Sequence, residues 1–217
     1  MSAIVVFGAG GRAGRRAVAE AVERGHRVTA VLRDPGRHAD LAGPAVTLVS
    51  GDVTDAGSVA AVAAGHDAAV NAATRLDVPA EEFYAAAARA LLAGLPRAGV
   101  GRLVAIGIGT VLETAPGVLV HDAPDFPTPH RVFSLGHLAG LEVLRTAPVG
   151  LDWVVLAPPP VFLDTEAPRT GRYRTGDGRL LPTAEGMPAF SYADLAVALL
   201  DEIETPRHHR ELVAVAS

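Results

Sequence analysis

The sequence predicts an α/β fold, in which helices cover both faces of a doubly wound, mostly parallel sheet. Two observations indicate this fold class. Within residues 1–71, short apolar runs alternate with helical patterns, and the connections between them are short. The chain has 217 residues, of which 49% are hydrophobic, which is enough for one sizeable core. We therefore expect a single domain over residues 1–217.

In the first half of the chain, each strand is a short run rich in Val, Ile, Leu and Ala, as in strands buried on both faces. We expect strands at residues 4–7, 28–32, 46–49, 68–71 and 103–106. We expect helices at residues 15–24, 57–64 and 81–98. Asp55 or Thr54 can cap the second helix, and Gly25 and Gly65 suit the ends of the first two. Strands that alternate with helices in this way pair in parallel.

The second half of the chain carries longer loops. We expect helices at residues 134–145 and 192–204, and strands at residues 153–156 and 212–216. Segments 111–134 and 158–190 are rich in Pro, Gly and charged residues, so we expect them to cover a substrate at the C-terminal side of the sheet. Within the later segment, Gly176, Asp177 and Gly178 predict the turn of a hairpin.

The composition excludes several kinds of site. There is no Cys, which excludes disulfides, thiol nucleophiles and thiolate zinc sites. All 19 basic residues are Arg, which excludes a P-loop lysine and a Schiff-base lysine. The net charge of -5 argues against nucleic-acid binding, and no apolar run is long enough to span a membrane. We expect a cytoplasmic protein without a metal site, and we interpret the His and Asp residues of 121–130 as a substrate-side loop.

A glycine-rich turn follows the first expected strand and precedes the first helix. Residues 8–14 read Gly-Ala-Gly-Gly-Arg-Ala-Gly. Glycine allows the tight turn and lets backbone N–H groups approach a pyrophosphate, and the positive end of the helix dipole faces the same anion. This context predicts the pyrophosphate site of a nicotinamide dinucleotide. The residues expected to contact it are Gly8, Gly10, Gly11, Arg12, Ala13 and Gly14.

The end of the second strand predicts which nicotinamide cofactor binds. NAD-selective sites place Asp or Glu here, where the carboxylate accepts from the ribose 2′-hydroxyl. This chain has Arg33 at that position, and a guanidinium suits the 2′-phosphate of NADP. Arg12 could add a second contact. We therefore expect NADP(H), with NAD(H) as the alternative if Asp34 and not Arg33 faces the ribose.

Two further strand ends are expected to line the cofactor. Asp52 and Val53 follow the third strand, where a carboxylate can accept from the adenine amino group. Asn71, Ala72 and Ala73 close the fourth strand, where small residues let the backbone pass the cofactor. Both ends lie at the carboxyl edge of the sheet, which is where ligands bind in open α/β folds.

Together these residues resemble a known family. The matching stretches are residues 8–14, Arg33, Asp52, and residues 71–73, 104–109, 151–159, 170–174 and 191–194. They resemble the atypical short-chain dehydrogenase/reductases of the NAD(P)H-binding, NmrA-like group, especially proteins provisionally described as NADH-flavin reductases and, more distantly, biliverdin reductase B. The resemblance implies a Rossmann-like sheet, a nicotinamide cofactor and a substrate pocket over its C-terminal edge. It also implies that Pro158 and the two prolines after it pass the nicotinamide.

The catalytic residues of typical short-chain dehydrogenases are missing. Those enzymes use a Ser at the end of strand five and Tyr-x-x-x-Lys on the next helix. Here Phe133 and His137 occupy the Tyr and Lys slots, and Thr110 is the hydroxyl nearest the end of strand five. Carbonyl–alcohol interconversion by the usual mechanism is therefore not expected.

The remaining candidates are on the acceptor side. His137 is the expected proton donor, because an unperturbed histidine titrates near ~6.5. Ser134 lies one turn earlier on the same face and could orient the ring, and Thr110 is the alternative proton source. The competing interpretation of His137 is an exposed helix residue without a role. Phe162 and Tyr173 could wall a planar acceptor.

These observations predict an NADP(H)-dependent oxidoreductase that transfers hydride to a small planar or conjugated acceptor, such as a flavin or quinone. An acceptor that delocalises charge needs little help from a protein acid, which fits the missing Tyr and Lys. Two alternatives remain open. One is a non-catalytic NADP(H)-sensing regulator of the NmrA-like type, and the other is an isomerase or dehydratase with a bound nicotinamide cofactor.

Overall fold

The computed structural model describes residues 1–161, 163–182 and 189–217. Its main sheet has the strand order β3-β2-β1-β4-β5-β8-β10-β9, and every pair is parallel except that of β9 with β10. The strands are β1 (Ala3–Phe7), β2 (Arg27–Leu32), β3 (Val46–Ser50), β4 (Ala68–Asn71), β5 (Arg102–Ile106), β8 (Asp152–Ala157), β9 (Arg174–Thr175) and β10 (Glu211–Ala216). The helices are α1 (Arg12–Glu23), α2 (Ala56–Ala63), α3 (Ala80–Arg97), α4 (Thr128–Arg145) and α5 (Tyr192–Glu204). The Rossmann-like α/β fold is confirmed.

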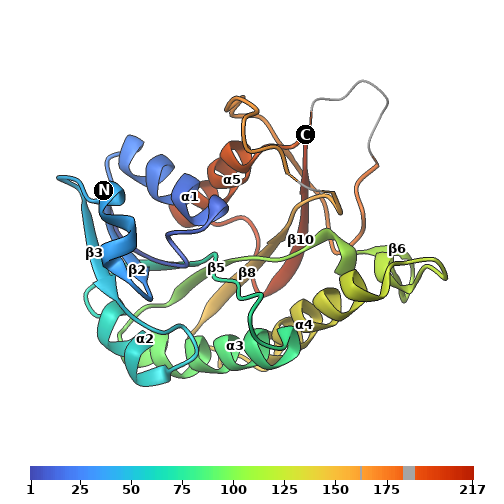
Figure 1. The fold of residues 1–217 in the computed structure, drawn as a ribbon, viewed down its shortest axis with the longest axis horizontal. Coiled ribbons are helices and arrows are strands. Elements are labelled where there is room, and N and C mark those ends of the chain that lie inside the picture. Colours follow the sequence, from blue (N-terminus) through green and yellow to red (C-terminus); the bar gives the residue numbers. More distant parts are fainter. Residues whose placement is uncertain (162, 183–188) are drawn as a thin grey trace.

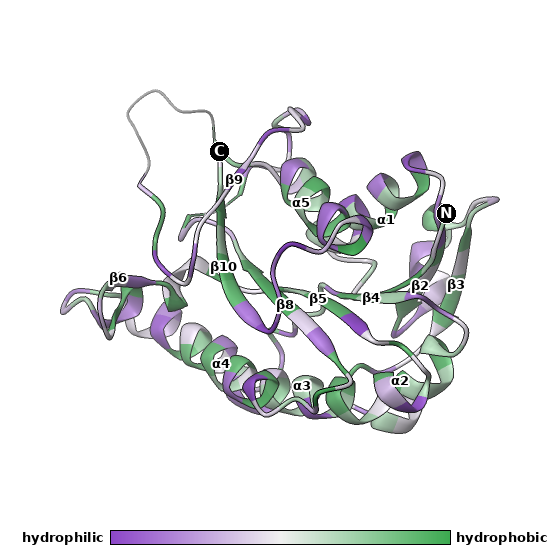
Figure 2. Cartoon of the chain, turned by 180° about the vertical axis from the view of Figure 1, so that it is seen from behind, coloured by the Kyte–Doolittle hydropathy of each residue, from purple (hydrophilic) through white to green (hydrophobic). Residues whose placement is uncertain are grey.

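Helices form a layer on each face of the sheet. α1 and α5 pack together on one face, while α2, α3 and α4 cover the other (Figure 1). Ile4 and Val6 face the first layer and Val5 and Phe7 the second, and all four are fully buried. Burial on both faces explains why the strand sequences are continuous apolar runs, and Figure 2 shows these strands as largely hydrophobic. No helix in the described part of the chain is long and apolar enough to cross a membrane.

The strand order reverses at β1, which lies between β2 and β4. The chain leaves β1 through the glycine turn into α1, and it leaves β4 through a loop that leads to α3 on the opposite face. The two connections diverge from neighbouring strands and open a crevice at the carboxyl edge of the sheet. This topology places the predicted cofactor residues around one opening.

Most expected elements are confirmed, with small shifts at their ends. α1 begins at Arg12 and not at residue 15, so the helix starts directly at the glycine turn. Asp55 caps α2, and its carboxylate accepts from the backbone N–H of Ser58 at 2.6 Å. Gly25 and Gly65 have φ angles of +82° and +77° just beyond the ends of α1 and α2, as a left-handed helix end requires.

Two expectations for the second half were wrong. α4 begins at Thr128 and not at residue 134, and segment 111–134 also contains a small antiparallel pair, β6 (Glu113–Ala115) and β7 (Val118–Leu119). The turn at residues 176–178 does not close a local hairpin. Instead β9 pairs with the end of the chain, with Thr175 opposite Val215 in β10.

Segment 163–175 is anchored to α1 and α5. Nε and Nη2 of Arg169 each donate to the buried carboxylate of Glu20 at 2.8 Å, and the Tyr173 hydroxyl donates to Asp201 at 2.6 Å. Tyr173 is thus tied to α5, and Phe162 lies outside the described residues. Short η1 (Pro35–Leu41), η2 (Gly109–Val111) and η3 (Val120–Asp122) helices complete the described chain.

Candidate functional site

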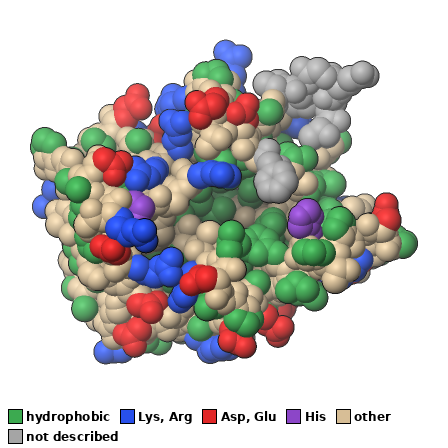
Figure 3. All heavy atoms as spheres, viewed as in Figure 1, with side chains coloured by type: hydrophobic (Ala, Val, Ile, Leu, Met, Phe, Trp, Pro, Cys, Tyr) green, Lys and Arg blue, Asp and Glu red, His purple; other side chains and the backbone are tan. Residues whose placement is uncertain are grey.

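A cavity of about 590 Å³ opens at the carboxyl edge of the sheet. The loops after β1, β2, β3 and β4 form its walls. The predicted cofactor residues that line it are Gly8, Gly10, Gly11, Arg33, Asp52, Val53, Ala72 and Ala73. Figure 3 shows a hollow on this face with hydrophobic side chains in its depth and Arg side chains beside it. Most of the predicted cofactor residues are therefore brought together at one opening.

The glycine turn has a geometry that only glycine permits at two positions. Gly8 has a φ of +74°, and a Cβ there would lie 2.5 Å from the Cα of Ala73. A Cβ on Gly14 would lie 2.1 Å from the carbonyl oxygen of Gly8. Gly11 differs, because the nearest protein atom to its Cβ would be that same oxygen at 3.5 Å. A side chain at Gly11 is therefore compatible with the fold and would extend beside the cavity that Gly11 lines.

The first turn of α1 is open to an anion. Its N-cap, Gly11, has no side chain to accept from the first N–H groups, and the first turn carries no acidic residue. The free N–H groups of Arg12, Ala13 and Gly14 carry the positive end of the helix dipole. These residues do not line the large cavity with their side chains, but the turn before them does.

At the end of β2, Arg33 and Asp34 line the large cavity. The Arg33 side chain is 64% exposed, and its nearest acid is Asp77 at 4.0 Å. Asp77 is held more closely by Arg75 at 2.5 Å, which lowers the pKa of Asp77 to about 2. Asp34 accepts from the backbone N–H of Gly36 at 3.1 Å as the cap of η1. Among the described residues, no hydrogen bond engages the Arg33 guanidinium, while the Asp34 carboxylate is occupied by its own turn.

The ends of β3 and β4 form the neighbouring walls. The Asp52 carboxylate accepts from the backbone N–H and the hydroxyl of Thr54 at 2.8 and 2.7 Å, and these bonds lower its pKa. Asp52 is therefore an ionised acceptor at the cavity wall. Asn71 points elsewhere: its Oδ1 accepts from the backbone N–H of Ala73 at 3.2 Å, and its side chain lines a second, smaller cavity.

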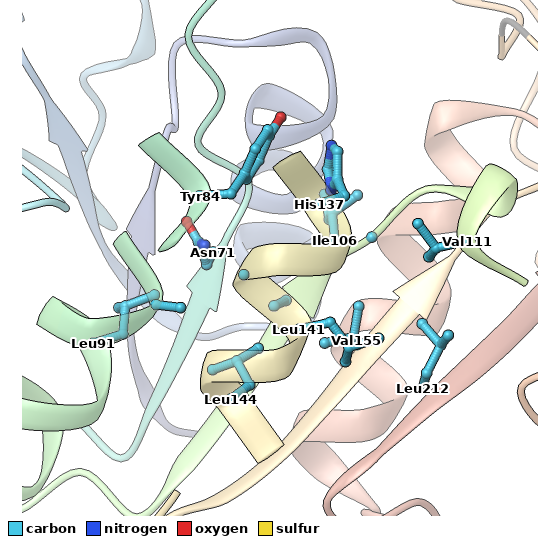
Figure 4. Close-up of a pocket in the computed structure, with 14 residues that line it drawn as sticks. Asn71, Tyr84, Leu91, Ile106, Val111, His137, Leu141, Leu144, Val155 and Leu212 are labelled. Carbon is cyan, nitrogen blue, oxygen red and sulfur yellow. The ribbon is translucent and has the colours of Figure 1, made fainter. Parts of the chain in front are cut away.

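The smaller cavity, of about 40 Å³, lies between α3, α4 and the ends of β4, β5 and β8. Tyr84 and His137 stand side by side at its upper end, with their polar atoms pointing the same way (Figure 4). Their ring centroids are 3.9 Å apart, and Phe133 packs edge-on against both. The Tyr84 hydroxyl is hydrogen-bonded to the Thr74 hydroxyl at 2.8 Å. This wall is aromatic and uncharged.

The environment of His137 overturns the expectation of a proton donor that titrates near neutrality. Burial against the aromatic rings lowers the pKa of His137 to about 3. The imidazole is therefore neutral at pH 7, and it can donate a hydrogen bond through one N–H but does not act as an imidazolium acid. Burial also raises the pKa of Tyr84 to about 12, so the phenol stays protonated as well.

Ser134 does not orient His137 as expected. It is fully buried, and its hydroxyl is hydrogen-bonded to the Thr110 hydroxyl at 2.5 Å. Thr110 is 8% exposed. This hydrogen bond ties the loop after β5 to α4, and it engages the hydroxyls of both Ser134 and Thr110.

Pro158 is buried directly beside that loop. A Cβ on Gly109 would lie 2.3 Å from the Pro158 carbonyl oxygen, so the loops after β5 and β8 pack closely. Within the described ranges, His, Asp and Glu side chains nowhere gather in a group of three that could hold an ion, and this includes the residues around His121.

The side chains that line these cavities include Arg37, His38, Arg75 and Tyr84, which the sequence did not indicate as site residues. Arg37 and His38 follow Arg33, at the predicted ribose position, by four and five residues, so they belong to the same loop. Tyr84 lies in the Ala-rich helix α3, and its contact with His137 of α4 depends on tertiary packing.

A family model for NAD(P)H-binding proteins matches residues 8–206, which include every residue that lines the large cavity except Phe7. The chain belongs to the NAD(P)H-binding family. A Bacillus subtilis relative of uncharacterized function, YwnB, is 32% identical over 217 residues, covering 99% of this chain and 98% of that protein. The resemblance to the atypical reductase group is thereby confirmed.

Two solved structures show how closely other proteins share this NAD(P)H-binding fold. A Burkholderia pseudomallei protein, provisionally described as exported, has 37% identity and a TM-score of 0.87, with both chains covered completely. A Streptococcus pneumoniae protein, provisionally described as an NADH-flavin reductase, has 25% identity and a TM-score of 0.84, again with complete coverage. The fold of this chain is thus that of NAD(P)H-binding, oxidoreductase-like proteins.

Proposed function

We propose that this protein is an NADP(H)-dependent oxidoreductase that transfers hydride to a small planar or conjugated acceptor of the flavin or quinone type. The observation that carries the proposal is the uncharged aromatic wall of Tyr84, Phe133 and His137 beside the dinucleotide cavity. Aromatic rings pack well against a flat conjugated acceptor. The resemblance to a protein provisionally described as an NADH-flavin reductase supports the same class.

The chemistry fits the residues that are present. A bound nicotinamide supplies the hydride, and the chain supplies orientation and a dry surface. The neutral imidazole of His137 and the protonated phenol of Tyr84 can donate hydrogen bonds but do not carry charge at pH 7. A flavin or quinone spreads the incoming charge and takes its proton from solvent, so it requires no stronger acid. An unactivated ketone would require one.

The preference for NADP(H) over NAD(H) is part of the proposal. Arg33 keeps free donors at the ribose position and Arg37 lines the same cavity, whereas the Asp34 carboxylate is occupied by the Gly36 N–H. Two guanidinium groups favour a dianionic phosphate over a hydroxyl. In this arrangement, residues 1–217 act as one domain, and the described parts of segments 111–134 and 158–190 flank the acceptor.

The test is the oxidation of NADPH with FMN, a benzoquinone and an aldehyde as acceptors. We expect turnover with the flavin and the quinone and none with the aldehyde. Gly11→Val is the control for the cofactor site, because its side chain fits the protein but occupies the space beside the turn where the pyrophosphate binds. It should lose both turnover and stabilisation by NADPH, while Gly43→Val, in open space, keeps both. Tight NADPH binding without turnover on any acceptor would instead support a sensor of NADP(H).

A further inference from the structure

Three side chains next to the glycine turn form a network that the proposed function does not use. Arg15, on the first turns of α1, donates through Nη1 to Asp40 at 2.5 Å and through Nε to the carbonyl oxygen of Gly10 at 3.2 Å. Its Nη2 lies 3.1 Å from Nδ1 of His38. The Asp40 carboxylate has a lowered pKa and balances the Arg15 charge. His38 is the member of this network that lines the cavity.

The network fixes the tautomer of His38. A guanidinium group has donors and no acceptor, so Nδ1 of His38 must accept from Arg15 and carries no proton. A neutral imidazole then has its proton on Nε2. Nε2–H is consequently a donor, and none of the hydrogen bonds among the described residues uses it.

The ring occupies a defined place on the cavity wall. A Cβ on Gly10 would lie 2.7 Å from both Cε1 and Nε2 of His38, so the ring edge fills the space that a side chain at position 10 would take. Gly10, His38, Arg33 and Arg37 all line the same cavity. The Nε2–H edge therefore lies between the pyrophosphate turn and the ribose-reading loop.

We propose that His38 is a specificity-determining residue, whose Nε2–H donates a hydrogen bond to the 2′-phosphate of the bound dinucleotide. The inference rests on the proposed preference for NADP(H), and it assigns part of that preference to a neutral donor aligned by Arg15. A hydrogen bond to a charged acceptor is stronger than one to a hydroxyl, so the contact discriminates between the two cofactors. Arg15 acts as the positioning residue.

The experiment measures binding without turnover. Adenosine 2′,5′-bisphosphate and adenosine 5′-monophosphate differ only in the 2′-phosphate, and calorimetry gives the affinity of each for the full chain. His38→Asn can place its amide oxygen near the Nδ1 position, where it accepts from Arg15, and leaves Nε2 empty, whereas His38→Gln reaches the Nε2 position with an N–H donor. His130→Asn, an exposed histidine on α4, is the matched control.

We expect His38→Asn to weaken the 2′,5′-bisphosphate at least about fivefold and to leave the 5′-monophosphate unchanged. His38→Gln should recover most of the loss, and His130→Asn should change neither ligand. An equal loss for both ligands would overturn the proposal, because the ring would then only shape the turn; so would no loss at all. If the unmodified protein binds both ligands equally, the proposed NADP(H) preference itself fails.

Discussion

At the scale of single residues, charged side chains line the large cavity, whereas none of the described residues that line the smaller one is charged at pH 7. Arg33 reaches solvent at the first cavity, and His137 is neutral under two aromatic rings at the second. Arg33 is charged at any physiological pH because of its guanidinium, whereas burial keeps the imidazole of His137 neutral. Arg33 and His137 are each the basis of a prediction.

Arg33→Ala should weaken NADPH binding at least tenfold, a loss of about 1.4 kcal/mol, because a guanidinium contact to the 2′-phosphate is removed. NADH affinity should stay nearly unchanged, since NADH carries a hydroxyl there. Fluorescence titration of both cofactors measures the two constants. Arg97→Ala removes the same charge from an exposed position at the end of α3 and should alter neither. Equal affinities in the unmodified protein would contradict the assignment.

His137 should make the fold sensitive to acid. Its folded pKa of about 3 lies below the unfolded value near ~6.5, so the unfolded chain binds the proton more readily and stability falls as pH drops below ~6.5. At pH 4 this difference amounts to about 3 kcal/mol. His137→Phe keeps an aromatic ring against Tyr84 and should therefore show a smaller fall in Tm between pH 7 and pH 4. Parallel Tm–pH curves would show that burial does not shift this group.

The lowered pKa of His137 also predicts a kinetic result. Between pH 5 and pH 8 the ring remains neutral, so kcat with a quinone should show no titration that His137→Gln removes.

The sequence predicts correctly that glycines of the turn and Arg33 lie at one opening, because each position follows directly from the end of a strand. The protonation of His137 and the place of Tyr84 depend on packing between α3 and α4, and no local pattern contains that information.

At the scale of elements, the strands and most helices follow directly from the sequence because burial on both faces leaves continuous apolar runs. The start of α4 does not. Pro127 and Pro129 suggest a loop, yet Pro129 lies in the first turn of the helix, where its missing N–H costs nothing. β9 also has no local signal, since its two residues are strand only because β10 lies beside them.

Asp194 anchors residues 170–171, which have no regular secondary structure. Its buried carboxylate accepts from the backbone N–H groups of Thr170 and Gly171 at 2.9 and 2.8 Å and from the Thr170 hydroxyl at 2.9 Å, while Ser191 caps α5. Asp194→Ala should lower the free energy of unfolding by about 2–4 kcal/mol, because these donors lose their partner. Urea unfolding measures the loss. Asp125→Ala, at an exposed position, should stay within about 0.5 kcal/mol of the parent.

At the scale of the whole molecule, the two edges of the sheet differ in the side chains that they carry. The carboxyl edge carries the cavities, and the amino edge carries a buried ionic network centred on Arg102. Arg102 donates to Glu202 at 2.8 Å and to Asp152 at 2.7 Å, and His208 lies 2.7 Å from the other Glu202 oxygen. The network joins β5, β8 and α5.

Arg102→Met should therefore destabilise the protein without affecting ligand binding. It leaves the Glu202 carboxylate buried without its guanidinium, which costs about 3–5 kcal/mol. Chemical denaturation measures that loss. The NADPH affinity of the folded protein should stay within about twofold of the parent, because the change lies at the opposite edge. A large loss of affinity in a variant that is still folded would show that the two edges are coupled.

α1 connects the glycine turn to the segment that follows β8. Its first turn faces the pyrophosphate site, while further along Arg16 donates to the Thr165 carbonyl oxygen at 3.0 Å and Glu20 holds Arg169 at 2.8 Å. Under the proposed function, this helix would support the dinucleotide with its first turn and the acceptor-flanking segment with its side. We therefore expect binding at either site to raise the affinity of the other. Steady-state kinetics should be sequential with the dinucleotide binding first, and product-inhibition patterns would reveal that order.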